Sequence, residues 1–317
     1  MDLLATLTPA ATLGDRLVLR TLLDSGSATD VIGWLTDLSS TEVTVAGLAG
    51  STTVRRSQVV AARLLPPALG GPGPMRTGAD ELEQIALPGW LAESEPLGEW
   101  TLRYGGGFTG RANSCLAVGE SGVEFAEAAR RVVDFAARHG IPPRAQVVVG
   151  SPADRGLTAC GWREVYVRTD VLAGRLTDLL GNRRADAAVE ISTTLSERWL
   201  QAYRISRPDP AEPAAVRAIL DGQPPRIFAS VTLDGRVVAI ARAHVHRSWM
   251  GASAIWTAPQ HRRLGWATKV ILTSGHWAAR QGARNVYLQV AAANATAHEA
   301  YGRLGFRLHH SYRYLAP

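Results

Sequence analysis

The fold class of this chain is decided by one stretch, Ile255-Trp256-Thr257-Ala258-Pro259-Gln260-His261-Arg262-Arg263-Leu264-Gly265-Trp266-Ala267-Thr268. It begins with the β-branched and aromatic residues typical of a strand end, and its proline breaks the strand before a helix starts. Arg262-x-x-Gly265-x-Ala267 then places successive backbone N–H groups at the helix start, where unpaired amides and the helix dipole favour an anion. Gly265 lets a ligand approach the backbone closely, and Arg262 and Arg263 add positive charge. The stretch therefore predicts a diphosphate-binding site.

A second motif follows at Asn294-Ala295-Thr296-Ala297-His298-Glu299-Ala300-Tyr301-Gly302-Arg303-Leu304-Gly305-Phe306, after a strand pattern at residues 285–290. Together the two motifs resemble the GCN5-related N-acetyltransferase (GNAT) superfamily. The first motif alone is short enough to arise by chance, whereas the ordered pair is much more specific. Many members of the superfamily have glycine where Arg263 stands, so the chain departs from the family pattern there. The alternative is an arginine-rich helix cap in an ordinary α/β domain.

The resemblance implies an acetyl-CoA-dependent enzyme in which an amine attacks the thioester directly within a ternary complex. In this superfamily the first motif holds the pyrophosphate, and the strand end contacts the pantetheine and polarises the thioester carbonyl. Asn294 would lie near the pantetheine, and Tyr301 would be the catalytic acid that protonates the leaving thiolate. The residues expected to bind acetyl-CoA are thus Ile255, Trp256, Thr257, Arg262, Arg263, Leu264, Gly265, Trp266, Ala267, Asn294 and Tyr301. No metal is expected.

The side chains of the second motif also have ordinary structural explanations. Asn294 is a good helix N-cap residue, which is compatible with a pantetheine contact. Tyr301 has helical spacing to Ala297 and Leu304 and, taken alone, would be a core aromatic residue. Its position between Asn294 and Gly305-Phe306 favours the catalytic interpretation.

The sequence leaves the general base open. His244 and His246 lie two residues apart on a predicted strand, so they share one face, and that face could open to the acceptor. We keep His244 as a catalytic candidate, although histidines with a structural or solvent-facing role are more common. His261 is expected to flank the phosphate loop. Carboxylates chosen by location alone are Glu190, Glu197 and Glu299.

Composition indicates a globular chain of 317 residues, of which 46% are apolar and 20% charged. No apolar run is long enough to span a membrane and the N-terminus lacks a basic signal region, so we expect a cytoplasmic protein. Cys115 and Cys160 lie in apolar stretches without CxxC spacing, and we expect two buried thiols. The net charge is +6 and Lys269 is the sole lysine, an arginine bias that points first to a GC-rich genome. The arginines are scattered, which makes nucleic acid an unfavoured partner.

Three domains are expected. Residues 1–66 contain short alternating strands and resemble an SH3-like β-barrel, and the proline- and glycine-rich residues 67–76 form a linker. Residues 77–180 and 181–317 show the same order of elements, which suggests an α/β (α+β) tandem GNAT fold. The first copy is degenerate: Ser121-Gly122-Val123-Glu124 replaces the phosphate motif, and Leu157 stands where Tyr301 stands in the second copy. The first copy would instead shape the acceptor cleft or the interdomain interface.

We therefore predict acetyl transfer to a primary amine by the second copy. The full arrangement is similar to an actinobacterial group linked to N-acetylglutamate synthesis, which makes an amino acid such as glutamate a candidate acceptor. The alternatives are a protein or peptide N-acetyltransferase and a non-catalytic acyl-CoA-responsive scaffold. A homodimer through an exposed strand edge is also kept open.

Overall fold

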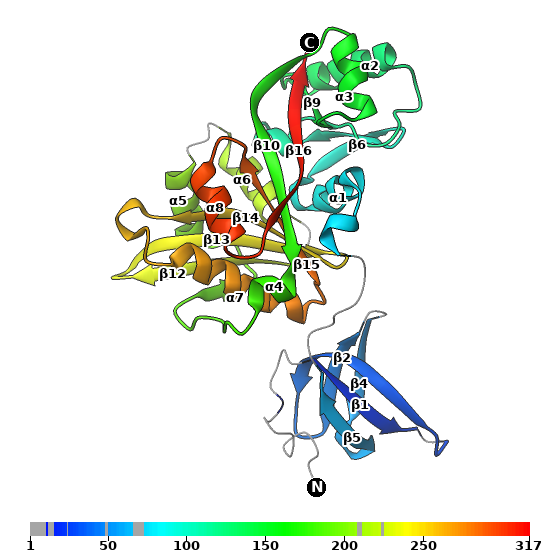
Figure 1. The fold of residues 1–317 in the computed structure, drawn as a ribbon, viewed down its shortest axis with the longest axis vertical. Coiled ribbons are helices and arrows are strands. Elements are labelled where there is room, and N and C mark those ends of the chain that lie inside the picture. Colours follow the sequence, from blue (N-terminus) through cyan, green and yellow to red (C-terminus); the bar gives the residue numbers. More distant parts are fainter. Residues whose placement is uncertain are drawn as a thin grey trace.

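The computed structural model of the protein describes residue 11 and residues 16–23, 25–47, 50–65, 73–207, 211–222 and 225–317. Its N-terminal part is a five-stranded antiparallel sheet in the order β4-β3-β2-β1-β5 (Figure 1). The strands are β1 (Arg16–Leu22), β2 (Ala28–Leu38), β3 (Glu42–Gly47), β4 (Gly50–Arg55) and β5 (Val59–Leu64), with the short helix η1 (Arg56–Gln58) before β5. One face buries a small core that includes Leu17, Leu35 and Val45.

This N-terminal sheet is confirmed as a small antiparallel β unit, but a closed SH3-like barrel is not. β4 and β5 are its two edges, and no pairing between them is found among the described residues. β4 gives only a weak strand signal in the sequence, because five of its six residues are exposed and its apolar alternation is weak. Residues 67–72 of the predicted linker lie outside the described residues, and its end forms η2 (Pro74–Arg76).

The rest of the described chain builds an eleven-stranded sheet in the order β11-β12-β13-β14-β15-β10-β16-β9-β8-β7-β6. Its first strands are β6 (Glu93–Leu97), β7 (Trp100–Tyr104), β8 (Cys115–Leu116), β9 (Ala145–Val148) and β10 (Arg163–Arg175). The later strands are β11 (Glu190–Ser192), β12 (Arg226–Leu233), β13 (Arg236–His246), β14 (Trp249–Thr257), β15 (Asn285–Ala291) and β16 (Arg307–Ala316). The helices are α1 (Ala79–Ala86), η3 (Leu87–Trp90), η4 (Gly110–Ala112), α2 (Phe125–Arg138), α3 (Pro152–Ala159), α4 (Leu176–Leu180), α5 (Glu197–Ser206), α6 (Pro213–Leu220), η5 (Pro259–His261), α7 (Trp266–Arg280) and α8 (Ala295–Gly302).

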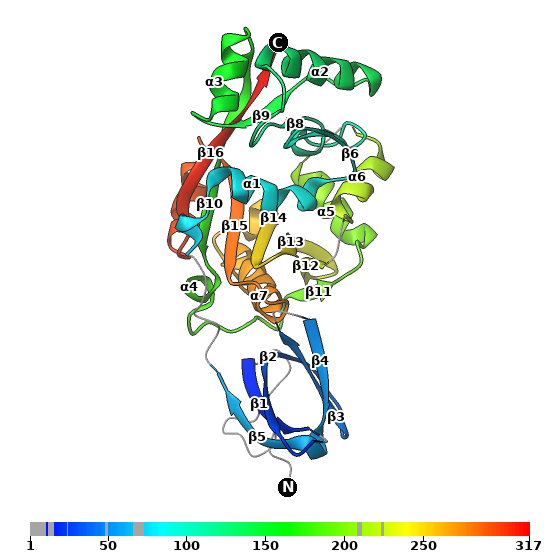
Figure 2. The ribbon, with the colours of Figure 1, turned by 90° about the vertical axis from the view of Figure 1, so that its right-hand side faces the viewer.

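The topology of this sheet is repeated. β8, α2, β9, α3 and β10 follow one another in the same way as β14, α7, β15, α8 and β16, and in both series the first two strands pair in parallel. The last strand of each series lies against the other series: β10 pairs with β15, and β16 pairs with β9. β10 and β16 also pair with each other and form the middle of the large sheet (Figures 1 and 2). The two halves therefore share one sheet and exchange their terminal strands.

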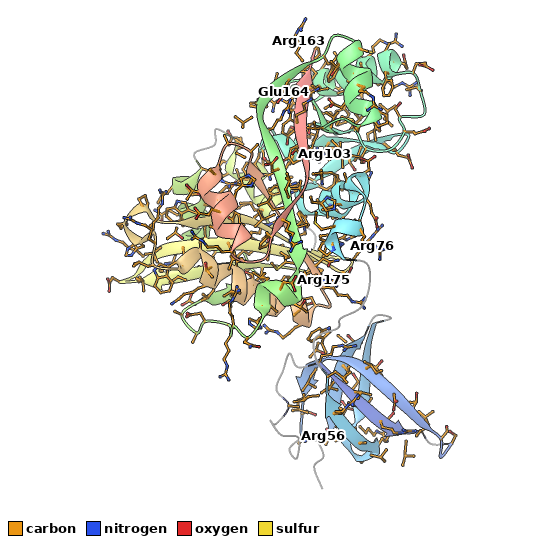
Figure 3. The ribbon with its side chains drawn as sticks, in the orientation of Figure 1. Arg56, Arg76, Arg103, Arg163, Glu164 and Arg175 are labelled. Carbon is orange, nitrogen blue, oxygen red and sulfur yellow. The ribbon has the colours of Figure 1, made fainter. Side chains whose placement is uncertain are left out.

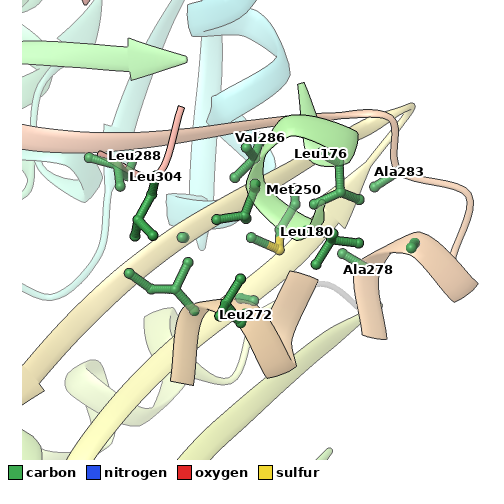
Figure 4. Packing of buried hydrophobic residues seen from close by; sticks show 14 of the residues in the cluster. Leu176, Leu180, Met250, Leu272, Ala278, Ala283, Val286, Leu288 and Leu304 are labelled. Carbon is green, nitrogen blue, oxygen red and sulfur yellow. The ribbon is translucent and has the colours of Figure 1, made fainter. Parts of the chain in front are cut away.

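Helices cover both faces of the second half of the sheet. α4, α7 and α8 pack on one face around a core that includes Leu180, Met250 and Leu288 (Figure 4). α1 covers the opposite face beside Tyr287 and Tyr312, and α5 and α6 cover it farther along. α4 follows the exchanged strand β10 and thus contributes to the core of the second half. Trp34 of β2 packs against the same core.

Local residue chemistry explains a helix start and a tight turn in this part of the chain. Ser151 caps α3 by accepting a hydrogen bond from the Asp154 backbone N–H at 3.1 Å. Asp234 and Gly235 both have positive φ values, 47° and 74°, at the tight turn that joins β12 to β13. The basic residues are spread over all parts of the molecule, as Figure 3 shows for Arg56, Arg76 and Arg175.

Candidate active site

A gap opens in the large sheet between β14 and β15. The two strands pair only from Trp249 and Asn285 to Ala252 and Leu288. Beyond these residues β14 stays bonded to β13, and β15 stays bonded to β10, so two strand edges face each other without a shared ladder. A bulge starts the separation, because the register to β13 shifts there and Ala254 has a φ of 53°. An extended ligand can bind such edges as an added strand would.

The predicted phosphate loop follows the end of β14. Pro259 begins η5, the chain then turns through Arg263 with φ 64° and Gly265 with φ 81°, and α7 begins at Trp266. The first N–H groups of a helix have no partner within it, and the positive end of the dipole lies there. Arg263 thus adopts the left-handed conformation that glycine adopts without strain, at the position where the family resemblance expects glycine. The backbone geometry expected of an anion site is present.

Side chains around this loop are mostly exposed. The Arg262 guanidinium donates to the Thr257 carbonyl oxygen at 3.4 Å, and Leu264 is 60% exposed. Lys269 lies over the Trp266 ring with its Nζ 4.3 Å from the ring centroid, and it pairs with Asp186 at 3.0 Å. A pocket of about 760 Å³ opens beside the strand end and is bordered by Trp256, Pro259 and His261, among others. The loop backbone therefore remains accessible to a ligand.

The second motif forms the helix α8. Asn294 is its N-cap, and its side-chain oxygen accepts a hydrogen bond from the Ala297 N–H at 3.1 Å. Tyr301 packs against the Phe306 ring and, with Ala297 and Ile255, against the core of the second half. Burial raises the pKa of the Tyr301 phenol, while the positive charge of Arg207 opposes this effect. The structure thus brings Tyr301 and the end of β14 onto one apolar cluster.

Polar atoms at the gap fit a ligand that has hydrogen-bonding groups. The side-chain oxygens of Ser253 and Thr257, both on β14, and the Trp266 indole N–H are buried without a partner among the described residues. Buried polar groups normally find partners, so unpaired ones indicate a site completed by another molecule. The three residues stand in β14 after its last pair with β15 and at the first position of α7, so they flank the predicted phosphate loop in the chain.

The expectation that His244 faces the acceptor is wrong, because the side chain is 4% exposed. Its Nε2 is in a hydrogen bond with the Tyr287 hydroxyl at 3.1 Å, and the ring is enclosed between Gly89 and Gly251. Burial, aided by the charge of Arg242, lowers the pKa of His244 to about 3. Gly251 also belongs to the paired part of β14, away from the open edges. His244 is therefore a neutral interior residue.

The other candidate bases occupy different parts of the surface. His246 is partly exposed at the end of β13, and His261 borders the pocket beside the loop. Glu197 pairs with Arg217, and Glu299 pairs with Arg303. Glu190 is exposed on the edge strand β11. None of these acidic residues borders the three described pockets, so no carboxylate base is assigned.

The prediction of two buried thiols holds for one cysteine. Cys115 is buried on β8, where burial raises its pKa to about 12. Cys160 is exposed, because it is the C-cap residue of α3, where the helix ends at the surface. No group of three or more metal-binding side chains is found in the described part of the chain. Among the same residues, no helix has the length and apolar character needed to cross a membrane.

Sequence analysis missed a second pocket, of about 540 Å³, at the end of β15. Its lining comes from both halves and includes Arg111, Arg144, Tyr166, Arg207, Gln289, Tyr312 and Tyr314. Tyr312 and Tyr314 are two residues apart on β16 and therefore lie on one face of that strand. This spacing was the sequence signal that could have indicated the pocket. The arginines come from separate loops, and only the fold brings them together.

The folded chain is a member of the GCN5-related N-acetyltransferase superfamily. Within it, the chain belongs to the family described as "Probable histone acetyltransferase Rv0428c C-terminal", whose model matches residues 80–315. The "Uncharacterized N-acetyltransferase YobR" of Bacillus subtilis (strain 168) is 25% identical over 234 residues, which cover 71% of this chain and 93% of that protein. The chain is therefore an acetyltransferase of the GNAT type, and this family uses acetyl-CoA as cosubstrate.

Solved structures share the fold. A GCN5-related N-acetyltransferase from Kribbella flavida superposes with a TM-score of 0.52 at 18% identity, over 76% of this chain and 95% of that one. A functionally unknown conserved protein from Staphylococcus epidermidis gives 0.50 at 10% identity, over 74% of this chain and 98% of that one. At these identities the likeness concerns the fold.

Proposed function

We propose that the chain transfers the acetyl group of acetyl-CoA to a primary amine at the gap between β14 and β15. The observation that carries this proposal is the position of the gap, because its open β14 edge leads directly into the loop before α7. A diphosphate at the loop and an extended pantetheine along the edge fit this order of groups. The same geometry supports Ile255, Trp256 and Thr257 as the strand contacts and Arg262 to Ala267 as the diphosphate contacts.

In the proposed reaction the neutral amine attacks the thioester carbonyl carbon and forms the C–N bond. Backbone N–H groups at the end of β14 stabilise the negative oxygen of the tetrahedral intermediate. The C–S bond then breaks, and Tyr301 donates its proton to the departing thiolate. The amine proton leaves through solvent and restores the Tyr301 phenol. An ordinary phenol, with a pKa near 10, is already protonated at neutral pH, as an acid must be, and burial raises the pKa of Tyr301 further.

The proposed domains are assigned from the position of the gap and from the strand pairing. Residues 181–317 would carry the chemistry, residues 77–180 would complete the acceptor side, and residues 1–66 would be a separate β module joined by the linker at 67–76. The exchange of β10 and β16 supports a tandem GNAT arrangement, since each half supplies a strand to the other. The order β4-β3-β2-β1-β5 supports a partly open SH3-like sheet.

Two acceptor classes deserve direct comparison. The resemblance suggests an amino acid such as glutamate, whereas the family description names histones, whose acceptors would be lysine side chains. The test is acetyl-CoA turnover with amino acids, small amines, a lysine-rich peptide and a peptide with a free N-terminus, followed by thiol release. Acetylation of one class identifies the acceptor. Acetyl-CoA binding without thiol release from any amine would contradict catalysis and favour a non-catalytic acyl-CoA-responsive protein.

A further inference from the structure

The first half covers one face of the gap between β14 and β15 with the Trp90 ring. Trp90 is the last residue of η3 and is 4% exposed. It belongs to the apolar cluster that contains Ala254, the residue of positive φ at the bulge where β14 leaves β15. This cluster lies on the face that α5 and α6 cover, whereas α7 and α8 cover the opposite face. Trp90 therefore lies across the sheet from the helices that begin at the proposed cosubstrate site.

Two arginine side chains connect the Trp90 ring to strands on both sides of the gap. The Arg242 guanidinium carbon lies 5.6 Å from the ring centroid, and Arg242 stands on β13 opposite Ser253 of β14. The Arg111 guanidinium carbon lies 4.0 Å from the same centroid, and Arg111 donates to the Gln289 side-chain oxygen at 2.5 Å. Gln289 directly follows the last residue of β15 that pairs with β14. The ring thus lies between side chains that are anchored on either side of the gap.

Close packing fixes η3, and with it Trp90, on the sheet. A Cβ added to Gly89 would lie 2.4 Å from the Cε1 atom of His244 on β13, so η3 has no room to move closer to that strand. The contacts with Arg111 and Arg242 are cation–π contacts, which hold the ring itself. A ligand that reaches this face of the gap would therefore meet a fixed aromatic wall.

We propose that Trp90 sets the length of the acyl group that the enzyme transfers. This inference rests on the proposed acyl transfer at the gap. A cosubstrate that enters from the side of α7 directs its acyl carbons toward the opposite face, where the ring lies. The two carbons of an acetyl group stop in front of the ring, whereas further methylenes overlap it or displace the thioester from the β14 backbone. The half without the diphosphate motif thus supplies the acyl specificity of the other half.

The acceptor amine keeps a route of its own to the thioester. The 540 Å³ pocket at the end of β15 is lined by Arg111 and Gln289, and Trp90 is not among its lining residues. The pocket therefore borders the gap beside the ring. The wall that limits the acyl chain and the opening for the amine are separate surfaces, so a smaller side chain at position 90 changes the first without removing the second.

The test measures kcat/KM for acetyl-, propionyl- and butyryl-CoA by thiol release with one acceptor amine. Wild-type protein should use propionyl-CoA about 10-fold and butyryl-CoA about 100-fold less well than acetyl-CoA, as misfits of one and two methylenes allow. Trp90→Phe and Trp90→Leu should raise the ratio of butyryl-CoA to acetyl-CoA use by about 10-fold or more. Trp162→Leu is the matched control, because Trp162 is also 4% exposed but packs in a cluster whose described residues include none from β14 or β15.

The ratio separates a wall from a core residue, since a purely structural role lowers stability and leaves the ratio unchanged. Equal use of the three thioesters by the wild type, or a wild-type ratio in both Trp90 variants, would overturn the inference and leave acetyl transfer intact. The wild-type series alone can overturn it if neither variant folds.

Calorimetric titration with acetyl-CoA and butyryl-CoA distinguishes this inference from the proposed transfer. If no amine releases thiol from any thioester, the transfer has failed, and the two Kd values decide on the wall. Weaker binding of butyryl-CoA that Trp90→Phe abolishes supports it. Equal Kd values in the wild type, or a difference that Trp90→Phe leaves unchanged, would contradict it.

Discussion

Each half of the large sheet buries one arginine in corresponding strands, and the two arginines have different surroundings. Arg103 on β7 donates to the Ser114 carbonyl and hydroxyl oxygens at 2.9 and 2.7 Å and to the Gln146 side chain at 2.9 Å. Gln146 in turn donates to Glu83 at 2.7 Å. The first half therefore closes its polar interior with its own side chains, including Glu83 of α1.

The second half leaves the corresponding groups incomplete. Arg242 on β13 donates to the backbone oxygens of Leu220 and Ile219, and its Nη1 has no partner among the described residues. Ser253, which pairs with it on β14, also has an unpaired hydroxyl. Burial lowers the pKa of Arg242 to about 10 without removing its charge at neutral pH. The first half thus has a satisfied structural core, whereas the second half keeps unpaired polar groups beside its gap.

The largest expected effect tests the second half at Tyr301, where the first half has the fully buried core residue Leu157. If Tyr301 is the catalytic acid, Tyr301→Phe lowers kcat by about 100-fold or more, while the Kd for acetyl-CoA changes little. Steady-state thiol release and calorimetry measure the two quantities. Tyr104→Phe in the first half is the matched control, since Tyr104 stacks on His139 and has no proposed role. An unchanged kcat with chemistry rate-limiting would make Tyr301 a core residue.

The second prediction concerns the number of acetyl-CoA sites. The turn before α2 carries Glu124 at the N-cap, whereas the turn before α7 carries arginines, so we expect one acetyl-CoA per chain. Arg262→Glu should weaken binding by about 2 kcal/mol, roughly 30-fold, because it removes a charged contact and adds repulsion. Calorimetry at low salt measures both the stoichiometry and Kd. Arg63→Glu carries the same charge change and should bind normally. Two equivalent sites per chain would refute the distinction between the halves.

Sequence alone predicted the parts of this picture that depend on local chemistry. The end of β14 at Thr257 and the Asn294 cap both follow from residue preferences over a few positions. The family and the acetyltransferase activity followed from two spaced motifs, and the family match confirms both. Residues close in sequence were sufficient for these conclusions.

Features that depend on long-range packing were not predictable in this way. The exchange of β10 and β16 joins strands that either half could pair within itself, and no local pattern distinguishes the two choices. His244 is on a strand whose alternation fits either face, and its burial depends on Gly89 and on Tyr287 from distant segments. The 540 Å³ pocket at the end of β15 similarly combines residues of η4, β10, β15 and β16, which come from both halves. Tertiary contacts decide such cases.

The third prediction uses the polar interior of the second half. The pKa of His244 is about 3 when folded and near 6.5 when unfolded, so the unfolded state takes up a proton first as pH falls. Stability from this group is therefore complete above about pH 6.5 and is lost below it, by about 1.4 kcal/mol at pH 5.5. His244→Gln should remove that part of the loss between pH 7.5 and 5.5, as measured by urea unfolding. The same acid sensitivity in the variant would show that His244 is not its source.

The smallest expected effect separates backbone from charge in the phosphate loop. The turn before α2 has Gly122 at φ 71°, and the turn before α7 has Arg263 at φ 64°, so a left-handed residue occurs in both halves.

Arg263→Gly relieves the strain of a side chain at positive φ, and the added freedom of the unfolded chain offsets this gain. The unfolding free energy should therefore change by less than about 1 kcal/mol. Its Kd for acetyl-CoA should stay within about threefold of the wild type. Arg263→Val removes the charge, as Arg263→Gly does, but its side chain is β-branched, so it should lower stability by about 1–2 kcal/mol and weaken binding further. Urea unfolding and calorimetry on both variants distinguish the cases. If both variants weaken acetyl-CoA binding equally, the Arg263 charge, and not the path of the backbone, is the feature that binds the ligand. The first half would then lack a binding site because its turn lacks this charge.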